Sequence, residues 1–182
     1  MNKAFAVALI AAGLVAGCQS SKEAREANPA PCPNIVTLQD AARQVVFVGD
    51  ETIENVAWTA EVADVSLACR YFGDKPIDAS IEIALAVGRG PKAEGAAHEF
   101  GYWVAVTRSN MEVIEKREFV APVKFDGDEN IVVIKQAIDE IVIPRKSEKT
   151  SGTNFEVVVG LAVTPQQAIY NRSGKSLKFP DL

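Results

Sequence analysis

The sequence predicts an all-β protein, an antiparallel β-sandwich of the immunoglobulin-like kind with one short helix near its C-terminus. Apolar residues recur at every second position through most of the chain, and turn-forming residues separate these runs. Eight or nine short strands with little helix are typical of two packed sheets. The cysteine–tryptophan–cysteine spacing of antibody domains is absent, because Trp58 lies too close to Cys69. The prediction therefore depends on the pattern of alternation.

The first long strand region, residues 56–71, changes phase part-way. Its apolar residues occupy even positions up to Val62 and odd positions from Ala63 to Tyr71. A slip of one residue moves every later side chain to the other face of a sheet. The sequence thus predicts either a β-bulge at Val62–Ala63 or a strand that crosses between two sheets. Trp58 shares the first phase and is expected in the core, and Cys69 points inward on the second.

The strands that follow are defined by the same alternation. It is cleanest over residues 77–87 and recurs over 119–125 and 155–163. Residues 102–119 are expected to form a hairpin that turns at Ser109–Asn110. Residues 130–143 also fit a helical stripe, but their β-branched residues favour two short strands.

Helical signals are confined to two short stretches. Thr164 is a candidate N-cap, and Pro165 would occupy the first helical position of the C-terminal helix. Residues 37–44 can form another turn, with Thr37 as its cap.

The N-terminus has the features of a secretory signal peptide. Lys3 precedes an apolar run of about fourteen residues, too short for the roughly twenty that a membrane-spanning helix needs. The run ends in Leu14-Val15-Ala16-Gly17-Cys18, which resembles the lipobox of bacterial lipoproteins. That resemblance implies cleavage between Gly17 and Cys18, and acylation of Cys18 by a diacylglyceryl thioether and an N-terminal fatty acid. An ordinary signal peptide that happens to end before a cysteine is the alternative.

The expected organisation has three parts. Residues 1–17 form the lipoprotein signal peptide, residues 18–31 a flexible tether, and residues 32–182 a single domain. In Gram-negative lipoproteins an Asp after the lipidated cysteine is the usual inner-membrane retention signal. Gln19 occupies that position here. The resemblance therefore implies a protein anchored by lipid in the outer membrane and facing the periplasm.

The cysteine count supports one disulfide. If Cys18 carries lipid, Cys32 and Cys69 remain as one pair in an oxidising compartment. A metal site is a weaker alternative, because His98 is the only histidine and no short-spaced cysteine pair is present. A C-x-x-C redox motif is also absent. We expect a Cys32–Cys69 disulfide and no metal.

The mature part resembles small uncharacterised envelope lipoproteins of alphaproteobacteria. The matching stretches are the opening residues 32–43, the central Cys69 and the closing residues 160–172. The resemblance implies no particular activity.

The charge balance argues against nucleic acid as a partner. The whole chain carries a net charge of −5, and removal of Lys3 with the signal peptide makes it −6. A negative domain is repelled by phosphate backbones and by anionic lipid in general. No phosphate-loop or Rossmann glycine pattern follows a strand, so we expect no nucleotide cofactor.

Residues 88–100 form the glycine-containing segment best suited to a functional loop. His98, paired with Glu99 or with Ser66 as nucleophile, is the one catalytic candidate, and Arg89 is a candidate anion ligand. No G-x-S-x-G motif accompanies them. A solvated loop histidine and a plain strand connection are the simpler interpretations. The acidic segment around Asp126 lacks the glycine and the glutamate of a calcium loop, which favours a hairpin turn.

Trp103 is the candidate contact residue. It lies out of phase with Tyr102, Val104 and Val106, so it is expected on the outer face of its strand. Together with Arg89 and His98 it forms the expected partner-contact region. The sequence therefore favours a non-catalytic interaction or structural module of the cell envelope, bound to another envelope protein. The alternative is a periplasmic ligand-binding protein or enzyme that uses the loop around His98.

Overall fold

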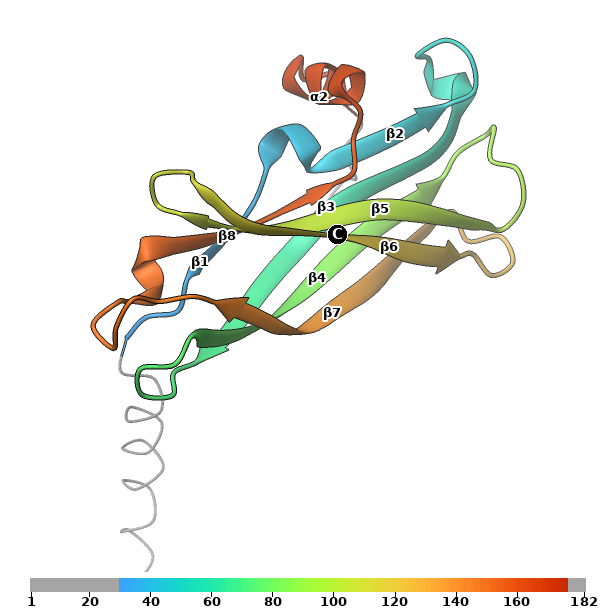
Figure 1. Cartoon of the computed structure of the whole chain (residues 1–182). Helices are drawn as coiled ribbons and strands as arrows, with labels where there is room; N and C mark the ends of the chain where they lie inside the picture. The colour runs from blue at the N-terminus through green and yellow to red at the C-terminus, as the bar shows by residue number, and fades with distance from the viewer. Residues whose placement is uncertain (1–29, 177–182) are drawn as a thin grey trace, which may run out of the picture.

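Two four-stranded sheets face each other in the computed structural model, which describes residues 30–176 (Figure 1). The first sheet has the order β1-β8-β5-β6 and the second the order β2-β3-β4-β7. The predicted all-β sandwich is thus confirmed. The signal peptide, Cys18 and most of the predicted tether lie outside the described residues. The strands are β1 (Asn34–Thr37), β2 (Arg43–Phe47), β3 (Val56–Arg70), β4 (Ile77–Arg89), β5 (Ala97–Arg108), β6 (Val113–Lys124), β7 (Ile131–Ile143) and β8 (Phe155–Leu161).

The strand order of this sandwich differs from that of immunoglobulin domains. Strands β2, β3 and β4 form an antiparallel meander, and β7 returns to pair with β4. In immunoglobulin constant domains the corresponding sheet has the order A-B-E-D. The short strand β1 pairs with β8 in parallel, while the other pairs are antiparallel.

Strand β3 contains the predicted bulge and stays within one sheet. Its pairing with β4 shifts register between Val62 and Asp64. The even positions from Val56 to Val62 are all buried, together with the small side chain of Ala57, and Cys69 is buried on the odd phase. The extra residue therefore accommodates the change of phase, and the strand does not cross to the other sheet.

The prediction of two short strands over residues 130–143 was wrong. Strand β7 is one continuous strand of 13 residues, and its pairing with β4 shifts register between the Ala79↔Ile141 and Ile81↔Ile138 pairs. The irregularity lets one strand bury Ile138, Ile141 and Ile143 on a single face. The helix-like stripe in the sequence was Ile131, Ile134, Ile138 and Ile141, of which only Ile138 and Ile141 are buried.

The core lies between the inner faces of the two sheets. Trp58 is buried in it, as expected. The largest side chains that are shielded almost completely come from four strands and the segment after β6: Phe100, Phe125, Ile77, Ile83, Leu85, Ile143 and Leu161.

The predicted disulfide is confirmed, and it pins the start of the domain to the end of β3. Cys32 and Cys69 are bonded, with their Cα atoms 5.7 Å apart. Beside it, the Tyr71 hydroxyl donates to the Pro31 carbonyl at 2.6 Å and accepts from the Gly152 amide at 2.8 Å. The backbone at Cys32 passes so close to Gly152 that a Cβ there would lie 2.5 Å from the Pro31 oxygen. The start of the chain and the β7–β8 connection are therefore locked together.

The predicted connections between strands are confirmed in part. The hairpin at Ser109–Asn110 joins β5 to β6 as predicted. The acidic segment 125–130 is not a hairpin turn, because it joins β6 in one sheet to β7 in the other. Gly88 and Arg89 belong to β4, and residues 97–100 belong to β5, so the loop between these strands covers only residues 90–96.

The C-terminal helix α2 (Pro165–Arg172) begins as predicted. Thr164 is its N-cap, Pro165 occupies the first position, and Gln167 completes a capping box. The other predicted cap was wrong: Thr37 ends β1, and the 3-10 helix η1 (Gln39–Ala41) follows Leu38. No helix among residues 30–176 is long and apolar enough to cross a membrane.

Candidate functional site

A groove of about 440 Å³ lies on the outer side of the β1-β8-β5-β6 sheet, where α2 and η1 approach β5. Trp103 of β5 forms part of its wall. Strand alternation places this side chain outward, while its neighbours Tyr102 and Val104 are buried in the core. Apolar and charged residues from five parts of the chain complete the lining: Leu38, Asp40, Ala41, Lys116, Glu118, Leu161, Ala162, Val163, Thr164 and Ala168.

The indole of Trp103 is fixed from below and from one end. It packs over Gly160 of β8, where a Cβ would lie 2.6 Å from the indole Cζ2. Its Nε1–H donates to the Leu161 carbonyl at 3.1 Å. A glycine inside a strand often marks a close approach of this kind. The ring is therefore held in one orientation and is half-buried.

Charged side chains border the indole. The Lys116 ammonium lies 5.2 Å from the centre of the Trp103 ring and 2.9 Å from a carboxylate oxygen of Glu118. On the other side of the groove, the Arg172 guanidinium hydrogen-bonds to Asp40 and lowers the pKa of that carboxyl. The groove thus combines an apolar floor with charges of both signs at its rim.

Helix α2 is held against β2 and η1, which fixes the far wall. The Asn171 amide donates to the carbonyls of Asp40 and Arg43 at 2.8 Å and 2.7 Å, and the Gln167 amide donates to Val45 at 3.1 Å. The Tyr170 ring also packs edge-on against Phe47 of β2, with centroids 5.9 Å apart, although no residue of α2 is buried. The groove is a preformed feature of the fold.

His98 lies elsewhere and is not a loop residue. It is the second residue of β5, and its ring stacks on Trp58 with centroids 5.0 Å apart and planes within 9°. The Phe100 ring meets it edge-on at 4.7 Å. Partial burial lowers the pKa of His98, and the nearby charge of Glu99 opposes this shift. The expectation of a solvated loop histidine was therefore wrong.

The catalytic pairings considered for His98 are not assembled. Ser66 is exposed on β3, eight residues along the strand from Trp58, which corresponds to about 25 Å. Glu99 is the residue after His98 in β5, and strand alternation places its exposed side chain on the opposite face from His98 and the buried Phe100. Within residues 30–176, no three His, Cys, Asp or Glu side chains are arranged to hold a metal ion.

Arg89 belongs to the same aromatic cluster as His98. Its guanidinium lies 5.5 Å from the centre of the Phe125 ring and donates to the Gly127 carbonyl at 3.2 Å. It supports the turn after β6. The structure separates Trp103, on the outer face of β5, from Arg89 and His98, which pack in the cluster with Trp58 and Phe125. They do not form one contact region.

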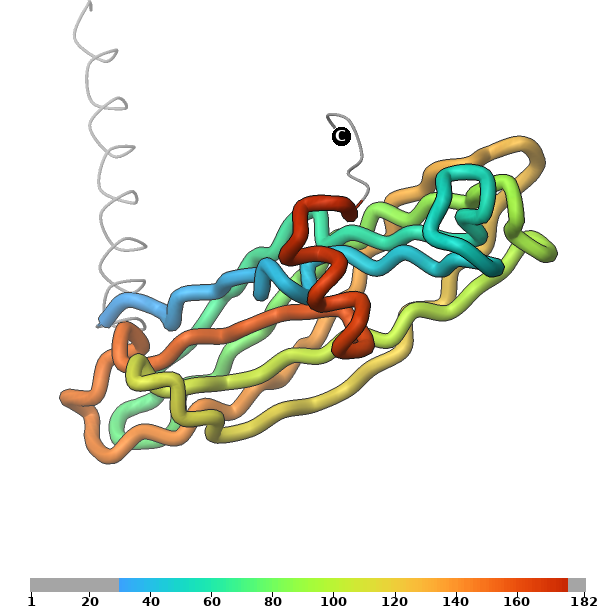
Figure 2. Tube along the Cα trace, turned by 90° about the horizontal axis from the view of Figure 1, so that it is seen from above, coloured from blue at the N-terminus to red at the C-terminus, as the bar shows by residue number. Residues whose placement is uncertain are grey.

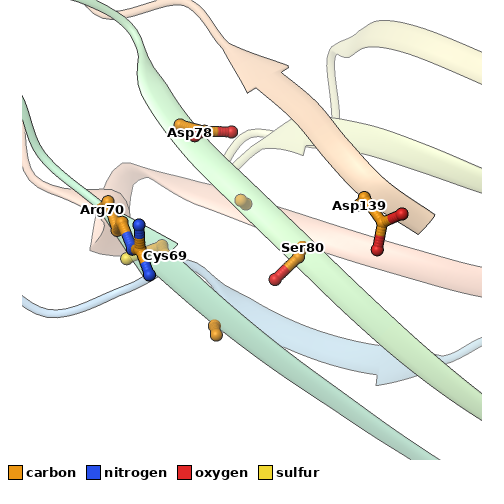
Figure 3. Close-up of a pocket in the computed structure, with 7 residues that line it drawn as sticks. Cys69, Arg70, Asp78, Ser80 and Asp139 are labelled. Carbon is orange, nitrogen blue, oxygen red and sulfur yellow. The ribbon is translucent and has the colours of Figure 1, made fainter. Parts of the chain in front are cut away.

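A second hollow, of about 300 Å³, lies on the outer face of the other sheet beside the disulfide (Figure 3). Its polar lining is Arg70, Asp78, Ser80 and Asp139, from three strands. Figure 3 shows these side chains spread over the sheet surface, without convergence on one point. None of them hydrogen-bonds to another within the described chain, so the hollow lacks the paired groups of a catalytic site.

Sequence reasoning found Trp103 and missed the rest of the groove. Gly160 was a possible signal, because it interrupts an apolar strand at an outward position. Lys116, Glu118 and the residues of α2 carried no such signal. Comparison with protein-family models, with curated proteins and with solved structures finds no match.

Proposed function

We propose that this chain is a lipoprotein anchored in the outer membrane through Cys18, and that it acts without catalysis as an interaction module of the cell envelope. Its contact site is the Trp103 groove, defined by the lining residues given above. The partner is another envelope protein that inserts an apolar side chain beside the indole and presents charges toward the rim.

The fixed indole at the open groove carries this proposal. Tryptophan is enriched among the residues that dominate protein–protein affinity, and it acts best in a preformed pocket with a polar border. Here Gly160 and the Leu161 carbonyl already hold the ring. Binding would then cost little side-chain entropy.

The charges at the rim favour a protein partner over a small apolar ligand. Lys116, Glu118 and Asp40 each have an intramolecular partner and remain accessible to a polar surface. Complementary charges around an apolar centre increase association rate and specificity. The alternative, an enzyme or ligand-binding protein that uses His98, has less support, because the His98 ring is engaged with Trp58 and Phe100.

Co-purification from crosslinked envelopes tests the contact. We expect Trp103→Asp to lower recovery of the partner by at least about tenfold, since a buried tryptophan anchor contributes about 2 kcal/mol or more. Val133→Ala removes an exposed apolar side chain of β7, which lies in the other sheet, and is expected to leave recovery unchanged.

A second variant controls for the possibility that Trp103→Asp misfolds. Glu118→Lys leaves the indole in place and reverses one rim charge, so a smaller loss of partner is expected in a normally folded protein. Full recovery of the same partner with both groove variants would contradict the proposed site.

A further inference from the structure

The two ends of the sandwich differ in charge. The connections β3–β4, β5–β6 and β7–β8 gather at the end where the described chain begins, and we name this the anchor end (Figures 1 and 2). The connections β2–β3, β4–β5 and β6–β7 lie together at the opposite, distal end. When each connection is counted with its flanking strand residues, the anchor end has six basic and three acidic residues. The distal end has three basic and seven acidic residues.

Close contacts confirm that the chain enters at the anchor end. Pro31 and Cys32 touch Tyr71 and Gly152, which belong to two of its connections. The Ser109 amide donates to the Asn154 carbonyl at 3.0 Å and ties the β5–β6 turn to the same end. A lipid on Cys18 would therefore be joined to this end by residues 18–31, which can span at most about 45 Å.

Three of the six basic residues of the anchor end line a hollow of about 470 Å³. Arg108, Lys146 and Lys149 line it with the hydroxyl groups of Ser109, Ser147 and Thr150. Arg108 forms an exposed ion pair with Glu112, whereas Lys146 and Lys149 have no ion-pair partner among residues 30–176. Ammonium and hydroxyl groups suit the phosphate oxygens of lipid headgroups.

Two apolar side chains project from the same end. Met111 at the β5–β6 turn is 85% exposed, and Phe72 at the β3–β4 connection is 52% exposed. Met111 has a φ of 66°, the left-handed conformation that residues other than glycine seldom adopt. The Arg108 carbonyl accepts from its amide at 2.8 Å and holds it there. Exposed apolar side chains beside lysines are typical of surfaces that enter the headgroup region of a bilayer.

We propose that the anchor end rests directly on the anionic lipid surface, with Met111 and Phe72 at the headgroups and Lys146 and Lys149 on the phosphates. This inference rests on the proposed lipid anchor. The net negative charge of the domain is no obstacle, because the acidic excess lies at the distal end and along the strands, away from the end that meets the membrane. The contact orients the sandwich and leaves the Trp103 groove along its side free for a partner.

Site-specific labelling of the lipidated chain in vesicles tests the orientation. The processed protein is reconstituted in phosphatidylethanolamine and phosphatidylglycerol, with a fluorescent label on Met111→Cys or, as a distal control, on Val48→Cys. Val48 is also apolar and is 56% exposed. The native cysteines leave no competing thiol if Cys18 is acylated, because Cys32 and Cys69 are bonded. A quencher attached to lipid headgroups should quench the Met111 label strongly and the Val48 label weakly.

Charge reversal provides the matched comparison. Lys146→Glu with Lys149→Glu should reduce the oriented population by at least about fivefold and bring quenching at Met111 down to the Val48 level. Lys92→Glu with Lys124→Glu makes the same change of charge at the distal end and should leave it unchanged. Salt at 1 M should weaken the difference between the labels, because it shortens the Debye length to about 3 Å.

The outcomes separate the two proposals. Vesicle-bound protein with equal quenching at both positions overturns the membrane contact and leaves the anchor intact; the basic end would then be a surface for a soluble acidic partner. If the protein does not associate with vesicles, the proposed lipid anchor is contradicted, and the proposed orientation is contradicted with it.

Discussion

At the scale of single residues, His98 shows how a polar side chain can serve the core. Its ring fills the space between Trp58 and Phe100, and these aromatic pairs stabilise beyond the area that they bury. Partial burial disfavours the charged imidazolium, so the pKa of His98 lies below its usual 6.5. The neutral form is the one that packs.

This shift predicts a loss of stability in acid. Because the pKa is lower in the folded than in the unfolded chain, the unfolded state binds more protons as the pH falls below about 6.5, and the free energy of unfolding decreases. His98→Phe keeps an aromatic ring and should remove this contribution, while His98→Ala should cost about 1–3 kcal/mol at neutral pH. Denaturant unfolding of the three proteins between pH 7 and pH 5 measures both effects. An identical pH dependence in wild type and His98→Phe would contradict this account.

Trp103 shows what a residue pattern reveals about a site. Alternation with Tyr102 and Val104 predicted that its side chain points outward, and the structure places it so. The pattern could not reveal that Gly160 lies beneath the ring, because the pairing of β5 with β8 joins two positions that are 57 residues apart in the sequence. A groove made by such long-range pairing is invisible in the local sequence.

At the scale of elements, the disulfide and the Tyr71 contacts form one clamp at the anchor end. Cys32 precedes β1, and Cys69 lies in β3 of the other sheet, so the bond joins the two layers. The closed loop spans a sequence separation of 37 residues. In the chain-entropy model, a loop of this length stabilises the fold by about 4 kcal/mol.

Removal of both cysteines should therefore lower the free energy of unfolding by about 4 kcal/mol. The double variant Cys32→Ala with Cys69→Ala avoids a free thiol, and reduction of the wild-type protein gives a matched comparison without mutation. Guanidinium unfolding measures the change, and peptide mapping without reductant should recover one linked pair. A loss under 1 kcal/mol, or two free thiols in protein isolated from the periplasm, would contradict this role.

Strand β7 and helix α2 mark the limits of element prediction. The helix was predicted correctly because its cap and proline act locally, within Thr164–Gln167. Residues 130–143 were divided wrongly into two strands, because a register shift against β4 sets their apolar spacing. Local signals thus predicted the Ser109–Asn110 turn and the Thr164 cap, whereas pairing between distant strands set the length of β7.

At the scale of the whole molecule, alternation predicted the two-layer β-sandwich but not the order of its strands. Segment 125–130 resembles an ordinary hairpin turn in sequence, and yet it carries the chain from one sheet to the other. Nothing local distinguishes the two outcomes, because both need only a short polar connection. The separation of charge between the two ends likewise depends on the fold, which brings three connections together at each end of the sandwich.

The lipid on Cys18 is the central claim, since both the envelope location and the oriented contact depend on it. Metabolic labelling with a fatty-acid probe, followed by membrane flotation, tests it most directly. We predict that the wild-type chain is labelled and floats with the outer membrane, and that Cys18→Ser abolishes the label and releases the protein from that fraction. Equal labelling of the two proteins, or an unlabelled wild-type chain in the soluble fraction, would contradict the account.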